Sequence, residues 1–258
     1  MCYNAEAQYR DKLRYALLRG DIHLADEIQR KLDQIEIEKN WLPLFFTSGF
    51  SHPELMVFTN AQPMVPQMFS WGLIPAWARD LKDAGIQRKK LLNARIETMF
   101  DLPSFKNSAR TKRCLVYLDA FYEYHDAGKK KYPFRISMAN GEPMVIGGLW
   151  GEWTDKHDGK MVHSFAIVTT EANDLMRKIH NLPAHSDTAR MPVILTKAQQ
   201  EEWLIDVNTE DDIKHIQSLG KISPEQLKAF TVAPLIGKAG VGNKIEATQE
   251  HVYEDLIF

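Results

Sequence analysis

The second residue of the chain, Cys2, could do chemistry that no other position offers. If Met1 is removed after synthesis, Cys2 carries both a free α-amine and a thiol. The ordinary pKa values of these groups are about 7.7–8.0 and about 8.5, so a fraction of each is nucleophilic near neutral pH. An amine and a thiol two carbons apart can both add to one aldehyde carbon and close a five-membered ring. The alternative is that residue 2 lies in a frayed, inert chain end.

Two polar residues in apolar segments could assist such a nucleophile. Asn93 follows two leucines, and a buried Asn must be hydrogen-bonded, so it is either a turn residue or a positioning group. Glu123 lies among Phe121, Tyr122 and Tyr124, and a carboxylate desolvated there could exchange protons near neutral pH. The alternative for Glu123 is a surface position on an edge strand.

Two histidines are candidates for a proton-transfer role. His180 ends an expected helix, where the helix dipole favours a histidine in any case. His185 follows five residues later in a polar loop and is the rival candidate. The nine histidines form no HExxH pair, and the chain has neither a P-loop nor a Rossmann glycine pattern, so we expect no metal and no cofactor.

Basic residues alternate with aromatic ones in the middle of the chain. The basic residues are Arg88, Lys89, Lys90, Arg95, Arg110, Lys112, Arg113, Lys129, Lys130 and Lys131. Trp71 and Trp77 could stack on unpaired bases, a contact that contributes about 1–3 kcal/mol per base in other proteins. Taken alone, each Trp is more often a residue that packs in the core or on the surface, and a solvated loop explains each lysine run equally well.

Length and composition are those of a folded protein. The chain has 258 residues, of which 44% are hydrophobic and 26% charged, which is enough for a sizeable core. The net charge is −2, so any nucleic-acid site must be a local basic groove. Two cysteines make no disulfide framework, and neither a membrane span nor a signal peptide is recognisable. We therefore expect a cytoplasmic protein, with Cys114 as a buried core thiol.

The elements that position these residues are expected to be mostly short strands. Apolar spacing predicts two helices between Tyr9 and Asn40, packed outside a core. Strands are predicted at 54–60, 68–71, 113–125, 143–153, 163–172, 191–196 and 230–237, with a proline-rich turn at 61–67 and a hairpin turn and return strand over 127–137. Helices are predicted at 172–180, 197–206 and 223–230, the first capped by residues 169–171 and the last by Ser223. The acidic segment 246–258 forms a tail. This pattern predicts one β-rich α+β domain over residues 1–258.

Seven segments, taken in order, resemble the SOS-response-associated peptidase (SRAP) family, the abasic-site processing proteins. They are Met1-Cys2, WGLIPAWA from Trp71, NARIET from Asn93, RCLVYLDAFYEY from Arg113, GGLWGEW from Gly147, FAIVTTEAN from Phe165, and IHN…RMPVIL from Ile179 to Leu195. The resemblance runs from Cys2 to about Leu195, with 9–40 as an apparent helical insertion. It implies a distorted β-barrel core with peripheral helices.

The resemblance also implies a mechanism and a substrate. The substrate is an abasic site in single-stranded DNA, whose ring-opened sugar presents an aldehyde. The Cys2 amine would form a Schiff base and the Cys2 thiolate would close a thiazolidine, which protects the lesion during the DNA damage response. Asn93 would hold the sugar, Glu123 would move protons, and His180 would help to open the sugar ring and resolve the crosslink. The family is also credited with clipping its own Met1, hence the peptidase label.

Residues that would contact DNA follow from the same resemblance. They are Trp71, Arg95, Tyr124, Arg190 and Asn4. The family commonly has Gly-Arg after the cysteine, with that Arg on phosphate, whereas this chain has Tyr3-Asn4 and lacks that cation. Tyr124 stands where a Trp is common and can still stack. The insertion between His180 and Arg190 leaves His185 as an alternative to His180.

Two other functions fit parts of the sequence. An N-terminal-nucleophile amidohydrolase would use the Cys2 thiol on a small amide with its own amine as base, and it would need no DNA. A non-catalytic single-strand-binding module would not use Cys2 and would bind intact and abasic strands alike. For the favoured reading we expect a monomer that needs no membrane and no nucleotide cofactor.

Overall fold

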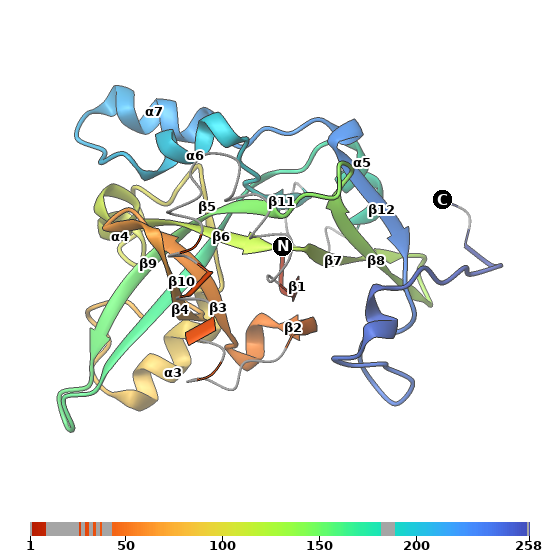
Figure 1. The fold of residues 1–258 in the computed structure, drawn as a ribbon, viewed down its shortest axis with the longest axis horizontal. Helices are drawn as coiled ribbons and strands as arrows, with labels where there is room; N and C mark the ends of the chain where they lie inside the picture. Colours follow the sequence, from red (N-terminus) through yellow and green to blue (C-terminus); the bar gives the residue numbers. More distant parts are fainter. Residues whose placement is uncertain are drawn as a thin grey trace.

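The computed structural model of the protein contains two β-sheets that share one hydrophobic core (Figure 1). It describes residues 2–8, 26, 29–30, 33–34, 37, 43–181, 189–256 and 258. The predicted helical insertion at 9–40 therefore lies outside the described residues, except for isolated positions between 26 and 37, which are helical.

The first sheet is five-stranded and antiparallel, and it contains the N-terminal strand. Its order is β12-β8-β7-β1-β2. The strands are β1 (Asn4–Ala7), β2 (Leu44–Ser48), β7 (Ala120–Asp126), β8 (Lys131–Met138) and β12 (Leu227–Thr231). Because β1 lies between β2 and β7, the segment that follows Cys2 is paired on both sides. The predicted β7–β8 hairpin is confirmed.

The second sheet has seven strands and closes on itself. Its strands are β3 (Glu54–Thr59), β4 (Gln62–Trp71), β5 (Asn93–Arg95), β6 (Arg113–Leu118), β9 (Met144–Thr154), β10 (Met161–Glu171) and β11 (Arg190–Pro192). β9 pairs with both β6 and β10, so the pairings β10-β4-β3-β6-β9-β10 form a small barrel. β5 and β11 extend this barrel along β10. The expected β-rich α+β fold with a distorted barrel is therefore confirmed.

Glycines in β9 let the barrel pack tightly. A Cβ at Gly148 would lie 2.8 Å from the Cys114 sulfur, and one at Gly147 would lie 2.8 Å from the Trp203 ring. Cys114 has no exposed surface, so the prediction that it is a core thiol is confirmed. Every residue of β6 is buried, as expected for a strand inside two packed layers.

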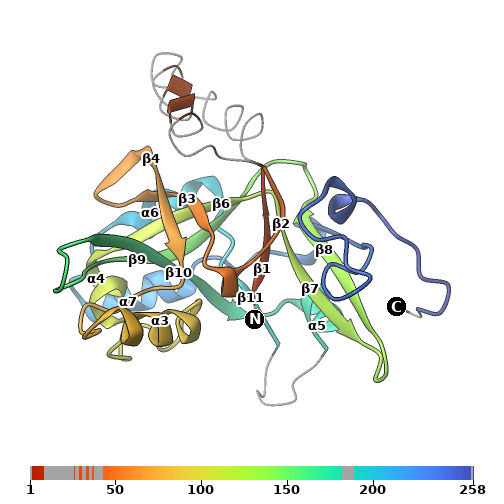
Figure 2. The same cartoon turned by 90° about the horizontal axis from the view of Figure 1, so that it is seen from below.

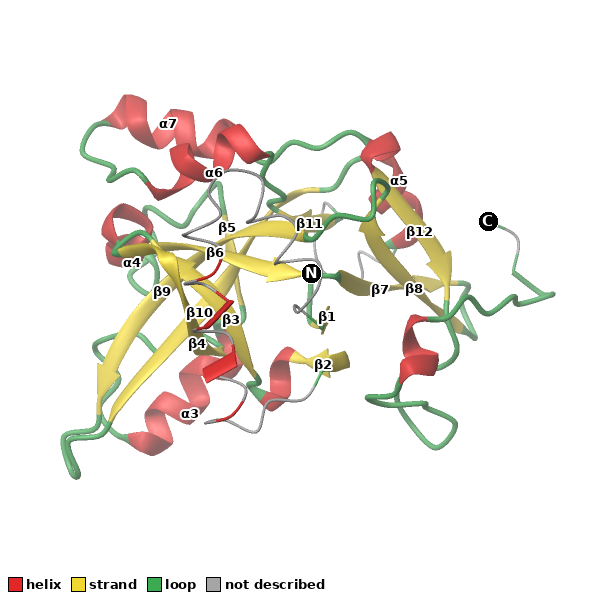
Figure 3. Ribbon diagram, viewed as in Figure 1, coloured by secondary structure: helices red, strands yellow, loops and turns green. Residues whose placement is uncertain are grey.

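Short helices lie around the barrel and the sheet (Figure 3). They are α3 (Leu81–Lys90), α4 (Lys106–Thr111), α5 (Asp174–Ile179), α6 (Lys197–Leu204) and α7 (Glu210–Ser218), with 3₁₀ turns η1 (Gly49–Ser51), η2 (Pro224–Gln226) and η3 (Ile245–Thr248). α6 confirms the helix predicted at 197–206, whereas α3, α4 and α7 were not predicted. α7 begins with a capping box between Thr209 and Asp212, a local signal that the apolar pattern did not reinforce.

Several predicted elements are wrong in detail. The strand predicted at 230–237 is one of them, because β12 ends at Thr231. Residues 223–230 were expected to form a helix, but only the turn η2 forms and the chain continues as β12, because pairing with β8 outweighs the local capping signals. The proline-rich segment 61–67 is mostly the start of β4, next to a bulge in its pairing with β3, where prolines are tolerated. The N-cap of α5 is Asn173 and not residues 169–171, which belong to β10. No helix among the described residues is long and apolar enough to cross a membrane.

Candidate active site

Cys2 is buried at the start of the first sheet, with 0% of its surface exposed. The carbonyl of the next residue, Tyr3, accepts a hydrogen bond from the Gly49 amide at 2.8 Å. Immediately after it, β1 enters the sheet between β2 and β7, and both views show the N-terminus between the two sheets (Figures 1 and 2). The alternative of a frayed, inert chain end is therefore wrong.

The environment of Cys2 keeps its thiol protonated. Burial raises the pKa of the thiol far above its ordinary range, and the negative charge of Glu123 raises it further. The sulfur also lies 3.9 Å from the Asn4 carbonyl oxygen, within reach of a weak hydrogen bond. At neutral pH the thiol is thus a poor nucleophile until a base removes its proton.

Glu123 is buried and paired with His180. Its carboxylate Oε2 lies 2.9 Å from Nδ1 of His180, and the carboxylate has little exposed surface. Glu123 is on β7, and His180 is the C-cap residue of α5. The alternative of a surface Glu on an edge strand is wrong, since β7 lies between β1 and β8. His185, the rival histidine, lies outside the described residues.

The contact between β7 and α5 is reinforced beyond the Glu123–His180 pair. Nδ1 of His125 lies 2.9 Å from the Lys178 carbonyl oxygen. The Asn181 side chain accepts from the Asp126 amide and donates to the Asp126 carbonyl, both at 2.8 Å. Because these bonds flank the pair along both segments, they fix how His180 faces Glu123.

Asn93 begins β5 and carries buried polar atoms. β5 runs parallel to β10, with Asn93 beside Ile167 in register. Neither the Oδ1 nor the Nδ2 atom of Asn93 has a hydrogen-bond partner among the described residues, although both are buried. Asn93 starts a strand, so the alternative of a turn residue is wrong. A buried amide with a free donor and a free acceptor can hold a sugar hydroxyl.

Trp71 is a core residue and does not stack on bases in this structure. It has no exposed surface, and its Nε1 donates to the Leu92 carbonyl at 2.9 Å. A Cβ at Gly49 would lie 3.1 Å from the indole ring, and Phe165 stacks on it with centroids 6.4 Å apart. Trp71 thus packs against Gly49, whose amide binds Tyr3, and donates to Leu92, the residue before Asn93. No face of the Trp71 ring is accessible in this structure, and its DNA contact stays a prediction.

Arg190 is held in place by hydrogen bonds to neighbouring residues. Its guanidinium bonds to both carboxylate oxygens of Glu97, at 3.1 and 2.7 Å, and to the Thr169 carbonyl at 2.7 Å. The side chain is almost fully buried and already paired, and its phosphate contact stays a prediction. Arg95, by contrast, is exposed on β5, and its side chain makes no hydrogen bond or ion pair within the described part of the chain. Its phosphate contact stays a prediction.

Asn4 and Tyr124 lie away from Glu123. Side chains alternate between the two faces of a sheet, and Asn4 is directly opposite Tyr122 on β7. Tyr124 packs beside Tyr122 in a small cluster with Phe46, on the face opposite to Glu123. The structure therefore does not bring these two predicted DNA-contact residues together with the Glu123–His180 pair.

Two residues near Cys2 were not singled out from the sequence. Phe50, on η1, is about half exposed at 53%, and its ring centroid lies 5.1 Å from that of Tyr3. His52 follows η1 in a left-handed backbone conformation with φ of 54°. No local signal reveals them, because only the turn at η1 brings them beside the chain start.

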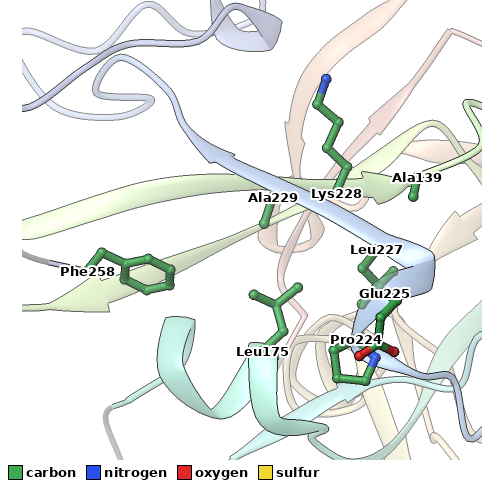
Figure 4. Close-up of a pocket in the computed structure, with 8 residues that line it drawn as sticks. All are labelled: Ala139, Leu175, Pro224, Glu225, Leu227, Lys228, Ala229 and Phe258. Atoms are coloured by element: carbon green, nitrogen blue, oxygen red, sulfur yellow. The ribbon is translucent and has the colours of Figure 1, made fainter.

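The pocket with a volume of about 600 Å³ lies elsewhere, between α5, β12 and the C-terminal residue (Figure 4). Its lining is mainly apolar, with Leu175, Ala229 and Phe258 facing the opening. None of the candidate site residues lines it. The described residues also contain no group of three or more His, Cys, Asp or Glu side chains that could hold a metal ion.

Comparison with known families agrees with the motifs. The family model described as "SOS response associated peptidase (SRAP)" matches residues 14–239. The Abasic site processing protein YoqW of Bacillus subtilis is 35% identical over 243 residues, covering 90% of this chain and 99% of that protein. The Abasic site processing protein YedK of Escherichia coli is 26% identical over 167 residues, covering 65% of this chain and 67% of that protein.

Solved structures show the same architecture. A crystal structure of a protein from Bacteroides thetaiotaomicron has a TM-score of 0.80 and 27% identity, covering 97% of this chain and 100% of that one. A second, from Bordetella bronchiseptica, has a TM-score of 0.65 and 23% identity and shows likeness of fold alone.

Proposed function

The chain belongs to the SOS response associated peptidase (SRAP) family, and from this premise we propose that it captures abasic sites in single-stranded DNA covalently through Cys2. The observation that carries the proposal is the position of Cys2, which is buried in a fixed strand start within electrostatic reach of Glu123, itself bonded to His180. We take the abasic site as the substrate because the relatives are named abasic site processing proteins.

The reaction begins once Met1 has been removed. The Cys2 amine adds to the aldehyde carbon of the ring-opened sugar, and loss of one water gives an imine. The Cys2 sulfur then adds to the imine carbon, while the thiol proton ends on the nitrogen. The product is a thiazolidine that joins the sugar carbon to both nucleophiles, with one water released in total and no redox change.

Glu123 and His180 supply the proton transfers. The raised pKa of the Cys2 thiol means that sulfur attack needs a base close by, and the Glu123 carboxylate is the charged group that acts on this thiol. The hydrogen bond between Glu123 and His180 lets a proton pass between carboxylate and imidazole. In our proposal the pair shuttles protons during imine formation and reversal, and His180 also assists ring opening of the sugar.

Asn93 positions the sugar in this scheme. Its amide offers one acceptor and two donors that the described residues leave unused, which suits a substrate hydroxyl. Arg95, exposed two residues later on the same face of β5, would contact a backbone phosphate. The proposal also includes removal of Met1 by the protein itself, which would account for the family's peptidase label.

Covalent capture can be tested directly. The protein is incubated with single-stranded DNA that contains one abasic site, and a band that survives denaturation is sought on a gel. We expect the band with the wild type and with Cys114→Ala, and none with Cys2→Ala. A band with Cys2→Ala would refute the thiazolidine.

Two further readouts separate the alternatives. Intact-mass spectrometry of the purified protein should show that Met1 is absent. Hydrolysis of a small amide by a protein that does not bind DNA would instead support an N-terminal-nucleophile amidohydrolase.

A further inference from the structure

Two basic side chains beside the candidate site carry buried nitrogens with no partner. These are Nε and one terminal nitrogen of the Arg88 guanidinium, and Nε2 of His52. Neither residue has a hydrogen bond from these atoms to any part of the chain that the structure describes. A guanidinium taken out of water without an acceptor is costly, so such atoms call for an explanation.

The backbone around these side chains is built to hold them in place. His52 has φ of 54° and ψ of 49°, a conformation that is unfavourable for any residue with a side chain. Its Nδ1 lies 2.8 Å from the Trp71 carbonyl oxygen, which can only accept, so Nδ1 carries a proton and Nε2 is left for another group. A Cβ at Gly72 would lie 2.8 Å from both the Arg88 carbonyl oxygen and His52 Nδ1, so a glycine is needed there.

Arg88 and His52 are electrostatic neighbours. Desolvation first, and then the charges of Arg88 and Lys89, lower the pKa of His52. Desolvation also lowers the pKa of Arg88, and no carboxylate among the described residues opposes this effect. The contacts of Gly72 place His52 beside the Arg88 backbone, and no described carboxylate offsets the charge of the Arg88 guanidinium.

His52 and the Arg88 backbone beside it adjoin the chain start that holds Cys2. The Gly49 amide binds the Tyr3 carbonyl, and His52 follows Gly49 by one 3₁₀ turn. The half-exposed ring of Phe50 lies between them and contacts Tyr3. An aromatic face beside a buried cation is the combination with which proteins bind single-stranded nucleic acid.

We propose that Arg88, together with the protonated form of His52, forms a phosphate subsite, which binds a backbone phosphodiester of single-stranded DNA next to the nucleotide captured by Cys2. Because the phosphodiester offers only acceptors, His52 takes up a proton on Nε2 when it binds and donates this N–H to a phosphate oxygen. The inference rests on the proposed function. A phosphodiester offers two charged oxygens to the two unpartnered Arg88 nitrogens, the geometry for which arginine is suited. This subsite places a cation near Cys2 even though the residues that follow Cys2 are Tyr3 and Asn4.

Binding of intact single-stranded DNA, without an abasic site, tests the subsite apart from the covalent chemistry. Affinity is measured by fluorescence anisotropy over a range of salt concentrations for the wild type, Arg88→Met and Arg79→Met. Arg79 is the matched control, because it precedes the same helix and its side chain is 83% exposed. We expect Arg88→Met to weaken binding by about tenfold or more, as loss of a charge-assisted bond would, and Arg79→Met to have a much smaller effect. The slope of log K against log salt should fall by about 0.7 for Arg88→Met, which is one phosphate contact.

Thermal unfolding distinguishes a binding role from a structural one. Arg88→Met removes an uncompensated buried charge, so we expect its melting temperature to equal or exceed that of the wild type. His52→Asn should keep the left-handed backbone and a donor to Trp71 while it removes Nε2, and it should also weaken DNA binding. Equal losses of affinity in Arg88→Met and Arg79→Met, or a destabilised Arg88→Met that binds like the wild type, would overturn the subsite.

The two proposals fail in different ways. A wild type that binds intact DNA through Arg88 but forms no covalent band refutes capture at Cys2 and leaves the subsite standing. A wild type that forms the band while Arg88→Met binds intact DNA as tightly as Arg79→Met refutes the subsite alone.

Discussion

The Glu123 carboxylate and the His180 imidazole, 57 residues apart in sequence, lie 2.9 Å from one another beside the buried Cys2 thiol. The two residues come from the central part of one sheet and from the end of a short helix, and hydrogen bonds through His125 and Asn181 hold those elements together. Each group of the proposed mechanism is thus attached to a different part of the fold.

Glu123→Gln should slow covalent capture and leave DNA binding intact. Glutamine has nearly the same shape but cannot accept the thiol proton, and loss of a positioned base costs about 10²–10⁴-fold in rate. The measurement is the single-turnover rate of band formation, with the dissociation constant for intact single-stranded DNA as the control. Equal rates for the variant and the wild type would remove Glu123 from the mechanism.

Substitution of the two rival histidines should separate their roles. We expect His180→Ala to slow both formation and reversal of the crosslink by about 10²-fold, because the proton carrier next to Glu123 is lost. His185→Ala is the matched control and should behave like the wild type. Reversal is followed by the release of DNA from purified crosslink, and a larger effect in His185→Ala would transfer the role to that residue.

The pH dependence of Cys2 reactivity follows from the direction of its pKa shift. Since burial and Glu123 both raise the thiol pKa, the thiolate fraction is small at neutral pH and grows about tenfold per pH unit below that pKa. The rate of Cys2 alkylation by iodoacetamide, followed by mass spectrometry, should therefore rise throughout the neutral and mildly alkaline range.

Glu123→Gln removes a negative charge that is one of the two causes of the raised Cys2 thiol pKa. The alkylation profile of Cys2 should therefore shift to lower pH in this variant. Cys114 is an internal control, because burial alone raises the pKa of this core thiol and it should stay unalkylated in both proteins. An unchanged Cys2 profile in Glu123→Gln would show that the carboxylate does not act on the thiol.

Trp71→Phe tests whether this tryptophan is structural. The change removes the donor to the Leu92 carbonyl and part of a close-packed ring, so we expect the free energy of unfolding to fall by about 2–4 kcal/mol. Trp77→Phe is the control, since Trp77 is 50% exposed and its substitution should cost about 0.5 kcal/mol or less. Urea denaturation gives both values. Unchanged stability combined with weaker DNA binding would restore the base-stacking role.

The residue types of the candidate site can be predicted from the sequence, whereas many of their contacts cannot. Glu123 and His180 were predicted because a carboxylate among aromatic residues and a histidine in a known motif are local signals. The burial of Trp71 and the Arg190–Glu97 pair depend on which strands flank β10, and the sequence does not encode that locally. Residues 223–230 show the same limit, because capping residues predicted a helix where sheet pairing with β8 produced a strand.

The pairing of β1 also orders events during synthesis. Residues 4–7 leave the ribosome well before their partners on β7, at residues 120–126. At about 5–20 residues per second, the interval is on the order of ten seconds. During that time β1 lacks β7, so Cys2 is not yet buried in the sheet, and removal of Met1 by the folded protein itself can begin only after that interval.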